Sequence, residues 1–417
     1  MTLPSRRVAV LVALAATASL AACSEPLSSG PPPTTQAPPT TTTIVGAPTP
    51  ALTLGSTYRA QLTYLMVEQV YLLGRVTQPL ATGATPTADA TGALDSNSHN
   101  ISDLLADAQG YGPSFDTAFY SLWTQRISDF EAYATADATS DKTGEATAVA
   151  SLATNATAIG TLVHGVNRFV EITTVTNPGT GMADEFGPDN TAVETFIDDQ
   201  ASKSTKSSTD LVAAAEAMYH TSDYMAAAAG KLDPVQYPGT IDGTAANLRA
   251  SITMSLVEHV DLMGMEIDGL IAGNDGEAAA ALSTNSQELH DIVAVNFGDG
   301  AAQQFDGIWS GYISQMKAYT TAKSSGDSAA AATAAGLLAG VPGAVGGFFH
   351  AQTSKLTSDG ISADLSPIVS GLQAAADAAV GNTGETAQLR TAATYVPQLG
   401  ADLSEAIALG NPSQYLP

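Results

Sequence analysis

The sequence has little cysteine, few aromatic residues and few basic ones. Of its 417 residues only Cys23 is a cysteine, so no disulfide can form within the chain. Lys and Arg number 15 against 41 Asp and Glu, which gives a formal net charge of −26. Because so acidic a surface repels phosphate backbones and anionic lipid headgroups, it excludes simple nucleic-acid binding. The charge favours solubility, and it would attract cations or basic partners.

Familiar catalytic signatures are also missing. The sequence contains no Gly-x-Ser-x-Gly, no His-Glu-x-x-His, no Walker loop and no Gly-x-Gly-x-x-Gly between a strand and a helix. Its acidic residues are scattered, so spacing identifies no carboxylate pair for acid and base catalysis. These absences argue against a known enzyme class, and an enzyme of unrecognised type remains an alternative.

The first 22 residues are typical of a signal peptide. Arg6 and Arg7 precede an uncharged apolar run over residues 8–22, which is too short to span a membrane stably as a helix. Its removal would leave 13 basic and 41 acidic residues, a net charge of −28. No later apolar run approaches transmembrane length, so we expect the rest of the chain to be extracytoplasmic.

The tetrapeptide Leu20-Ala21-Ala22-Cys23 resembles the bacterial lipobox. That resemblance implies that Cys23 becomes the lipidated first residue of the mature protein, carrying palmitate and anchoring it to the cell membrane. A buried free thiol is the alternative for this cysteine. Residues 23–54 are rich in Pro and Thr and poor in large apolar side chains, which predicts a disordered tether.

The two tryptophans, Trp123 and Trp309, lie in matching surroundings, which reveals an internal repeat. They are 186 residues apart (309 minus 123), and their neighbours match at the same offset. The matched neighbours are Phe119 with Phe305, Ile127 with Ile313, and Tyr133 with Tyr319. We therefore predict two homologous domains, residues 55–240 and 245–417, each of which folds alone around its tryptophan.

Apolar residues at helical spacing predict an all-α fold. One stripe passes through Leu256, Val260 and Met263, and a matching stripe occurs near the start of the first repeat. The Gly-rich segments 273–276 and 326–327 should end helices. We expect five or six helices per repeat, packed as a bundle. Residues 172–176 are typical of a loop or a short strand.

The order of motifs resembles a known family. Glu258-His259-Val260 is followed by Asn285-Ser286, an aromatic-Gly pair and Phe305-x-x-x-Trp309. This order is similar to secreted tandem helical-repeat lipoproteins of bacilli and actinobacteria, whose activity is unestablished and some of which are labelled copper amine oxidase N-terminal-like. The sequence lacks the Asn-Tyr pair from which the copper amine oxidase cofactor is made. In the family pattern a His also precedes the Ile, and Tyr312 replaces it here.

His259 and Met263 are candidate metal ligands. They lie one turn apart on the same helical stripe, and imidazole and thioether groups suit copper. Copper or another cation is therefore a candidate cofactor. The alternative is a core histidine that hydrogen-bonds a neighbouring helix, and the first repeat has Gln69 at this position.

His164 and His350 recur in both repeats, four residues after Gly160 and Gly346. Each glycine and histidine share one helix face, where the missing side chain lets another backbone approach. Each histidine is expected to hydrogen-bond that neighbour or to hold a small ligand. Altogether the sequence favours a lipid-anchored envelope protein that binds or scaffolds an envelope partner without catalysis. Metal sequestration is the main alternative.

Overall fold

The computed structural model describes residues 50–108, 110–170, 181–237, 241, 243–274 and 276–415. Within these ranges the chain is helical and contains no strand, so the predicted all-α class is confirmed. The predicted signal peptide, Cys23, most of the tether and residues 172–176 lie outside the described ranges. Predictions about those segments therefore stay predictions.

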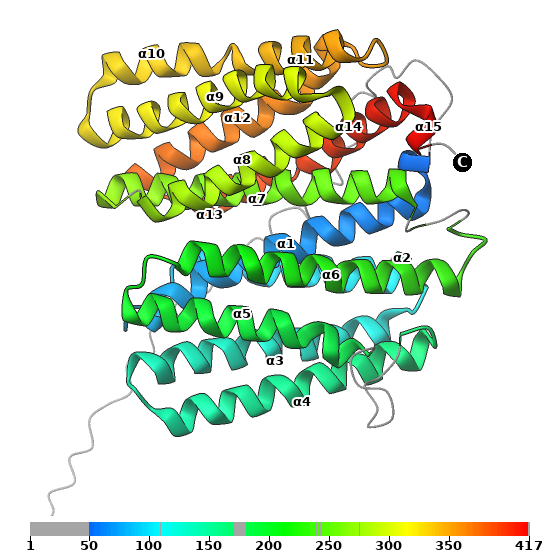
Figure 1. The fold of residues 1–417 in the computed structure, drawn as a ribbon. Helices are drawn as coiled ribbons and strands as arrows, with labels where there is room; N and C mark the ends of the chain where they lie inside the picture. Colours follow the sequence, from blue (N-terminus) through cyan, green and yellow to red (C-terminus); the bar gives the residue numbers. More distant parts are fainter. Residues whose placement is uncertain are drawn as a thin grey trace, which may run out of the picture. The chain divides into compact units, whose positions relative to one another are not determined.

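The helices fall into two successive groups along the chain (Figure 1). The first group is α1 Leu54–Ala81, α2 Ala88–Ala108, α3 Pro113–Ala138, α4 Lys142–Val166, α5 Met182–Ser202 and α6 Ser207–Leu232, preceded by a 3-10 turn, η1, at Pro50–Leu52. The second group is α7 Thr244–Ala272, α8 Gly276–Phe297, α9 Asp299–Ser325, α10 Ser328–Leu338, α11 Val341–Gln352, α12 Ser358–Gly381, α13 Glu385–Ala393, α14 Val396–Gly410 and α15 Pro412–Tyr415.

Hydrogen bonds recur at the repeated positions. The Asn97 amide of α2 donates to the Glu68 carboxyl of α1 at 2.6 Å, and Asn285 of α8 donates to Glu258 of α7 at 3.1 Å. The Tyr133 hydroxyl donates to Asp198, as Tyr319 donates to Asp377. Because the same side chains join corresponding helices in each group, the sequence repeat is also a repeat of packing.

Both tryptophans lie in the hydrophobic core. Trp123 of α3 stacks on Phe119, and Trp309 of α9 stacks on Phe305, with ring centroids 5.4 Å apart in each pair. The Gly-rich segments end helices as expected, since Gly273 and Gly326 cap α7 and α9 in the left-handed conformation. The stripes read from the sequence are the buried faces of α1, α3, α7 and α9.

The second group divides two helices that are continuous in the first. Helices α10 and α11 stand where α4 stands, and α13 and α14 stand where α6 stands. Both breaks precede a proline, Pro342 or Pro397, in the first turn of the following helix. Proline cannot donate a backbone hydrogen bond and disfavours a helical conformation in the residue before it.

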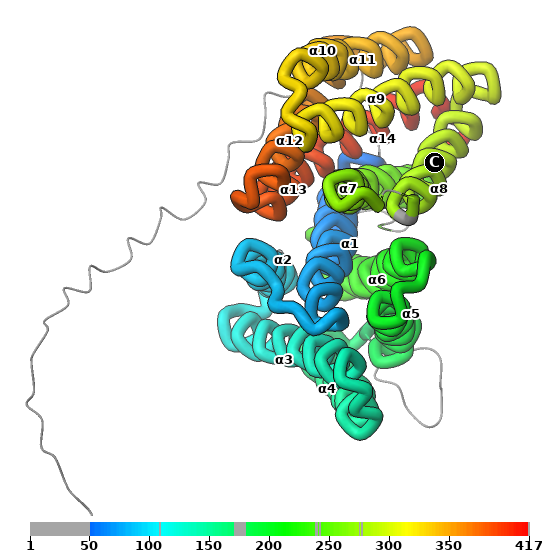
Figure 2. Tube along the Cα trace, turned by 90° about the vertical axis from the view of Figure 1, so that its left-hand side faces the viewer, coloured from blue at the N-terminus to red at the C-terminus, as the bar shows by residue number. Residues whose placement is uncertain are grey.

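Helices α1 and α7 pack against each other between the remaining helices, while α2 lies beside α13 and α6 beside α8 (Figure 2). Two equivalent arginines cross this contact in opposite directions. Arg59 of α1 hydrogen-bonds the side chain of Asn247, and Arg249 of α7 donates to the Ala51 carbonyl and the Thr57 hydroxyl, both at 2.9 Å. Whether each half also folds alone remains a prediction.

We expected no later segment to reach transmembrane length. Judged by length and composition, this expectation is wrong. Two helical segments, Lys142–Val166 and Ser328–Gln352, are long and apolar enough to cross a membrane, and 39% of an apolar 18-residue window in each is buried. The expectation missed them because alanine, glycine and threonine supply their length and large apolar residues are few.

Candidate binding site

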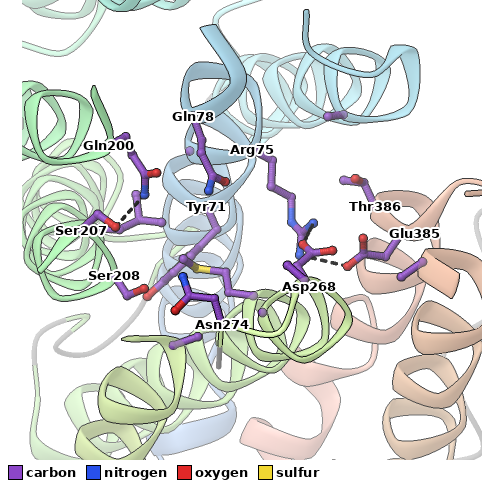
Figure 3. A pocket seen from close by; sticks show the side chains of 18 of the residues that line it. Tyr71, Arg75, Gln78, Gln200, Ser207, Ser208, Asp268, Asn274, Glu385 and Thr386 are labelled. Carbon is purple, nitrogen blue, oxygen red and sulfur yellow. Dashed lines mark hydrogen bonds and ion pairs between the residues drawn. The ribbon is translucent and has the colours of Figure 1, made fainter. Parts of the chain in front are cut away.

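A cavity of about 1070 Å³ lies at one end of the α1–α7 contact (Figure 3). Its wall comes from the last turns of α1, α5, α7 and α12 and from the first turns of α2, α6, α8 and α13. Both halves of the chain therefore contribute. A cavity of this size is in the range that encloses a small organic ligand.

Two equivalent glycines lie at or near the cavity: Gly74 lines it, and Gly264 packs against Arg75, which lines it. A Cβ atom at Gly74 of α1 would lie 3.0 Å from a methyl group of Leu211, and one at Gly264 of α7 would collide with the guanidinium of Arg75. The absence of a side chain at Gly264 therefore gives Arg75 its place. Glycine inside a helix costs about 1 kcal/mol relative to alanine, which the packing of these neighbours offsets.

Left-handed residues end three of the helices at the cavity. Lys203, Gly273 and Asn382 follow α5, α7 and α12 with φ of 56°, 73° and 52°. A residue in the left-handed conformation lets the chain change direction after a helix, so the next helix can return along the cavity wall. Short helix-ending segments thus place polar side chains at the rim.

Arg75 is held between two carboxylates inside the cavity. Its guanidinium lies 3.1 Å from Asp268 and 3.3 Å from Glu385, and its side chain is only 13% exposed. Although burial lowers the pKa of Arg75, the Glu385 and Asp268 carboxylates raise it above its ordinary value. Burial in turn raises the pKa of Glu385, and the charge of Arg75 opposes that rise by favouring the carboxylate. The arginine is consequently a cation that the protein itself neutralises.

Most of the other polar groups on the wall are uncharged. The Gln200 amide donates to the Ser207 hydroxyl at 2.6 Å, which fixes one pair across the α5–α6 turn. In Figure 3 this pair lies on one side of Tyr71, with Arg75 on the other. The labelled uncharged groups are Tyr71, Gln78, Gln200, Ser207, Ser208, Asn274 and Thr386.

Buried carboxyl groups lie along the α1–α7 contact next to the cavity. Burial raises the pKa of Glu258 to about 8, while the hydrogen bond from Asn285 opposes that shift. Burial, reinforced by Glu68, raises the pKa of Asp261 well above its ordinary value. Glu68 itself lies 3.4 Å from Arg390. The contact between the two halves therefore contains buried acids, and burial favours the protonated form of Glu258 and Asp261.

His259 lies in the core, away from solvent, with 2% of its surface exposed. Its Nε2 is 3.3 Å from the Tyr312 hydroxyl, and its ring centroid is 4.6 Å from that of Trp309. Burial lowers the pKa of His259 to about 4, so the imidazole is neutral. Met263 is fully buried one turn further along α7.

The predicted metal ligands are not joined by others. Across the part of the chain that the structure describes, no group of three or more His, Cys, Asp or Glu side chains is placed to hold a metal ion. His259 instead contacts the neighbouring helix α9, as in the alternative that the sequence left open. The copper prediction thus rests on His259 and Met263 alone.

His164 and His350 make equivalent contacts at helix ends. The Nδ1–H of His164 donates to the Val170 carbonyl at 2.6 Å, and that of His350 donates to the Leu356 carbonyl at 2.7 Å. Both bonds are to the segment that follows the histidine's own helix, whereas the sequence suggested a neighbouring helix or a ligand. Neither histidine lines the cavity.

Gly160 and Gly346 allow the close approach that the sequence predicted. A Cβ at Gly160 would lie 3.1 Å from the Cβ of Met182, and a Cβ at Gly346 would collide with the Ser358 carbonyl oxygen. The cavity residues themselves were not predicted. Their only sequence signal was the Gly-rich turn at 273–276, which marks a helix end and says nothing of what meets there.

Comparison with known protein families, curated proteins and solved structures found no match to this chain. The resemblance to tandem helical-repeat lipoproteins consequently has no support beyond the motifs themselves. Any function must be argued from the cavity and from the residues around it.

Proposed function

We propose that this chain is a cell-envelope lipoprotein that acts as a non-catalytic binding module, and that the cavity between its halves holds the ligand. The cavity is the observation that carries the proposal, because its volume of about 1070 Å³ suits a small ligand. Its polar side chains come from both halves, so a bound molecule would contact both at once. The missing catalytic signatures favour binding over chemistry.

The cavity is tested by filling it. Ala280 is exposed on α8 and lines the cavity, whereas Ala153 is equally exposed on α4 and does not. The mature protein is incubated with a fractionated envelope extract, and retained molecules are identified by native mass spectrometry. We expect Ala280→Trp to lose a molecule that wild type and the Ala153→Trp control both retain. If all three proteins retain the same molecules, or none, the cavity is not the binding site.

The anchor is tested at Cys23. We expect the mature protein to partition into detergent and to incorporate labelled palmitate, and Cys23→Ser to lose both properties. The lipobox-like tetrapeptide motivates this expectation. A variant that still partitions and still takes up the label would show that another feature holds the protein at the membrane.

A further inference from the structure

The charged side chains that line the cavity carry both signs, with Arg75 and Lys203 on the same wall as Asp89, Asp268 and Glu385. Arg75 lies between Asp268 and Glu385. The Asp89 carboxylate accepts a hydrogen bond from the Ala387 backbone in the first turn of α13, at 3.3 Å. Four helices begin and four end at the wall, so the positive and negative ends of their dipoles oppose one another. The cavity consequently offers no concentrated charge for a strongly anionic or cationic ligand.

Amide side chains supply exposed, uncharged polar groups on the wall, while Ser208 and Thr386 are only 2% and 4% exposed. Gln78 and Asn274 are exposed on α1 and after α7, and Thr386 lies across the cavity from Ser208 (Figure 3). A hydroxyl donates one hydrogen bond and accepts others, and an amide does both through separate atoms. A ligand that matches this surface also carries many groups that both donate and accept.

Apolar surface lies between these polar groups. Met265 and the methyl groups of Ala272 and Ala378 line the same wall. Mixed polar and apolar walls suit a molecule whose hydroxyl groups alternate with C–H faces, as in a sugar ring. The mixed polar and apolar wall and the volume of the cavity together favour a chain of several sugar rings over a single small metabolite.

Peptides fit the cavity less well than sugars. Extended peptides pair with a sheet edge, and the described residues contain no strand. Amphipathic helices need a continuous apolar groove, and acidic motifs need a cluster of unpaired arginines. Here the polar groups interrupt the apolar wall, and the arginine is paired.

We propose that this cavity binds a short, uncharged oligosaccharide through the amides of Gln78 and Asn274. This inference rests on the proposed binding function and deepens it by naming the ligand class. Gln78 comes from the first half and Asn274 from the second, so the bound sugar would contact both halves.

Calorimetric titration of the mature protein tests this class directly. The probes are maltotriose, cellotriose and triacetylchitotriose, with trigalacturonic acid as the charged comparator and trialanine as the peptide comparator. We expect at least one neutral trisaccharide to bind and to bind more tightly than either comparator. Because each lost hydrogen bond costs about 1 kcal/mol, Gln78→Ala combined with Asn274→Ala should weaken that binding about tenfold or more.

Matched variants separate the ligand class from the binding site. Ala280→Trp should abolish sugar binding, and Ala153→Trp should leave it unchanged, with helicity and melting temperature compared for all variants. No heat with any neutral sugar, or tighter binding of either comparator, overturns the sugar proposal. If Ala280→Trp nevertheless loses a molecule taken from envelope extract, the binding function stands with another ligand class. If it loses none, both proposals fail.

Discussion

Arg126 and Asp189 form a buried ion pair that the second half of the chain lacks. The Arg126 guanidinium hydrogen-bonds Asp189 and Asn190, and it lies 4.8 Å from the centre of the Phe130 ring. Burial lowers the pKa of Arg126 to about 9. At the repeat offsets of 186 and 179 the second half has Tyr312 and Ile368 instead. The two halves thus fill equivalent packing positions differently, with an ion pair in the first half and with a tyrosine and an isoleucine in the second.

Removing one partner of this pair should be far more damaging than replacing both. We expect Asp189→Ala to lower the free energy of unfolding by about 3–5 kcal/mol, because it leaves a buried guanidinium without its counter-ion. The double variant Arg126→Tyr with Asp189→Ile should recover most of that loss, since it copies the second half. Urea denaturation of the three proteins measures this, and a double variant no more stable than Asp189→Ala would contradict it.

His259→Gln should change stability little, since Gln69 occupies the equivalent place in the first half. The substitution removes the 3.3 Å contact with Tyr312, which corresponds to about 1 kcal/mol, together with the ring contact with Trp309. Thermal melts measure that change. Titration of Cu(I), Cu(II) and Zn(II) against a competing chelator measures metal binding in the same two proteins. Stoichiometric binding by wild type that the variant loses would make His259 a ligand after all.

Comparing the two repeats in the sequence identified residues that occur in both of them. It could not identify important residues that occur in only one repeat. Asn97 and Asn285, or His164 and His350, could be picked out because each occurs twice at one offset. Arg75 and Glu385 have no counterpart of the same type, and their approach depends on how α1, α7 and α13 pack. A side chain whose partner lies on a distant helix leaves no periodic trace in the sequence.

At the scale of helices, two equivalent glycines offer a matched comparison. Gly346 of α11 faces the Ser358 backbone of α12, while Gly160 of α4 faces only the side chain of Met182 as closely as 3.1 Å. The Ser358 backbone would have to move to relieve its collision, whereas the 3.1 Å contact with the Met182 Cβ needs a shift of only a few tenths of an ångström. The repeat therefore places the same residue under different steric demands.

We expect Gly346→Ala to destabilise the protein by about 1–3 kcal/mol, because the added methyl group forces α11 and α12 apart. Gly160→Ala should be nearly neutral, since the higher helix propensity of alanine, about 1 kcal/mol, offsets a small shift of Met182. Chemical denaturation compares the two variants with wild type. Equal effects at the two positions would mean that α11 and α12 are not in such close contact.

Helix existence could be predicted from the sequence more readily than helix division. The stripes around Trp123 and Trp309 predicted α3 and α9 because apolar residues at helical spacing bury one face. The breaks before α11 and α14 depend on single prolines, Pro342 and Pro397, inside otherwise helical segments. A proline in such a segment either kinks a helix or begins a new one, and the surrounding packing decides which.

At the scale of the whole chain, the notable feature is that buried acids lie where the two halves meet. Sequence predicted the repeat and the overall charge, but it did not indicate that α1 and α7 would bury Glu68, Glu258 and Asp261 together. Composition counts all acidic residues together, so it does not distinguish a few buried acids from the many exposed ones. Their burial couples the contact between the halves to pH.

Stability should therefore fall as pH rises. Burial raises the folded-state pKa of Glu258 from 4.5 to about 8, and it raises that of Asp261 above 3.8. Between the unfolded and folded pKa values the folded chain binds more protons than the unfolded chain. For Glu258 the associated stability is complete below about pH 4 and is lost as pH approaches 8, by up to about 1.4 kcal/mol per pH unit.

Glu258→Gln isolates this effect, because an amide keeps the shape of the protonated acid and cannot ionise. We expect urea denaturation between pH 5 and pH 8 to show a steep loss of stability in wild type and a shallower one in Glu258→Gln. Asp107→Asn, at an exposed acid of α2, removes one unit of negative charge without touching the α1–α7 contact, so its slope should match that of wild type. A Glu258→Gln slope as steep as that of Asp107→Asn would mean that general charge repulsion, and not the buried acid, governs the pH dependence.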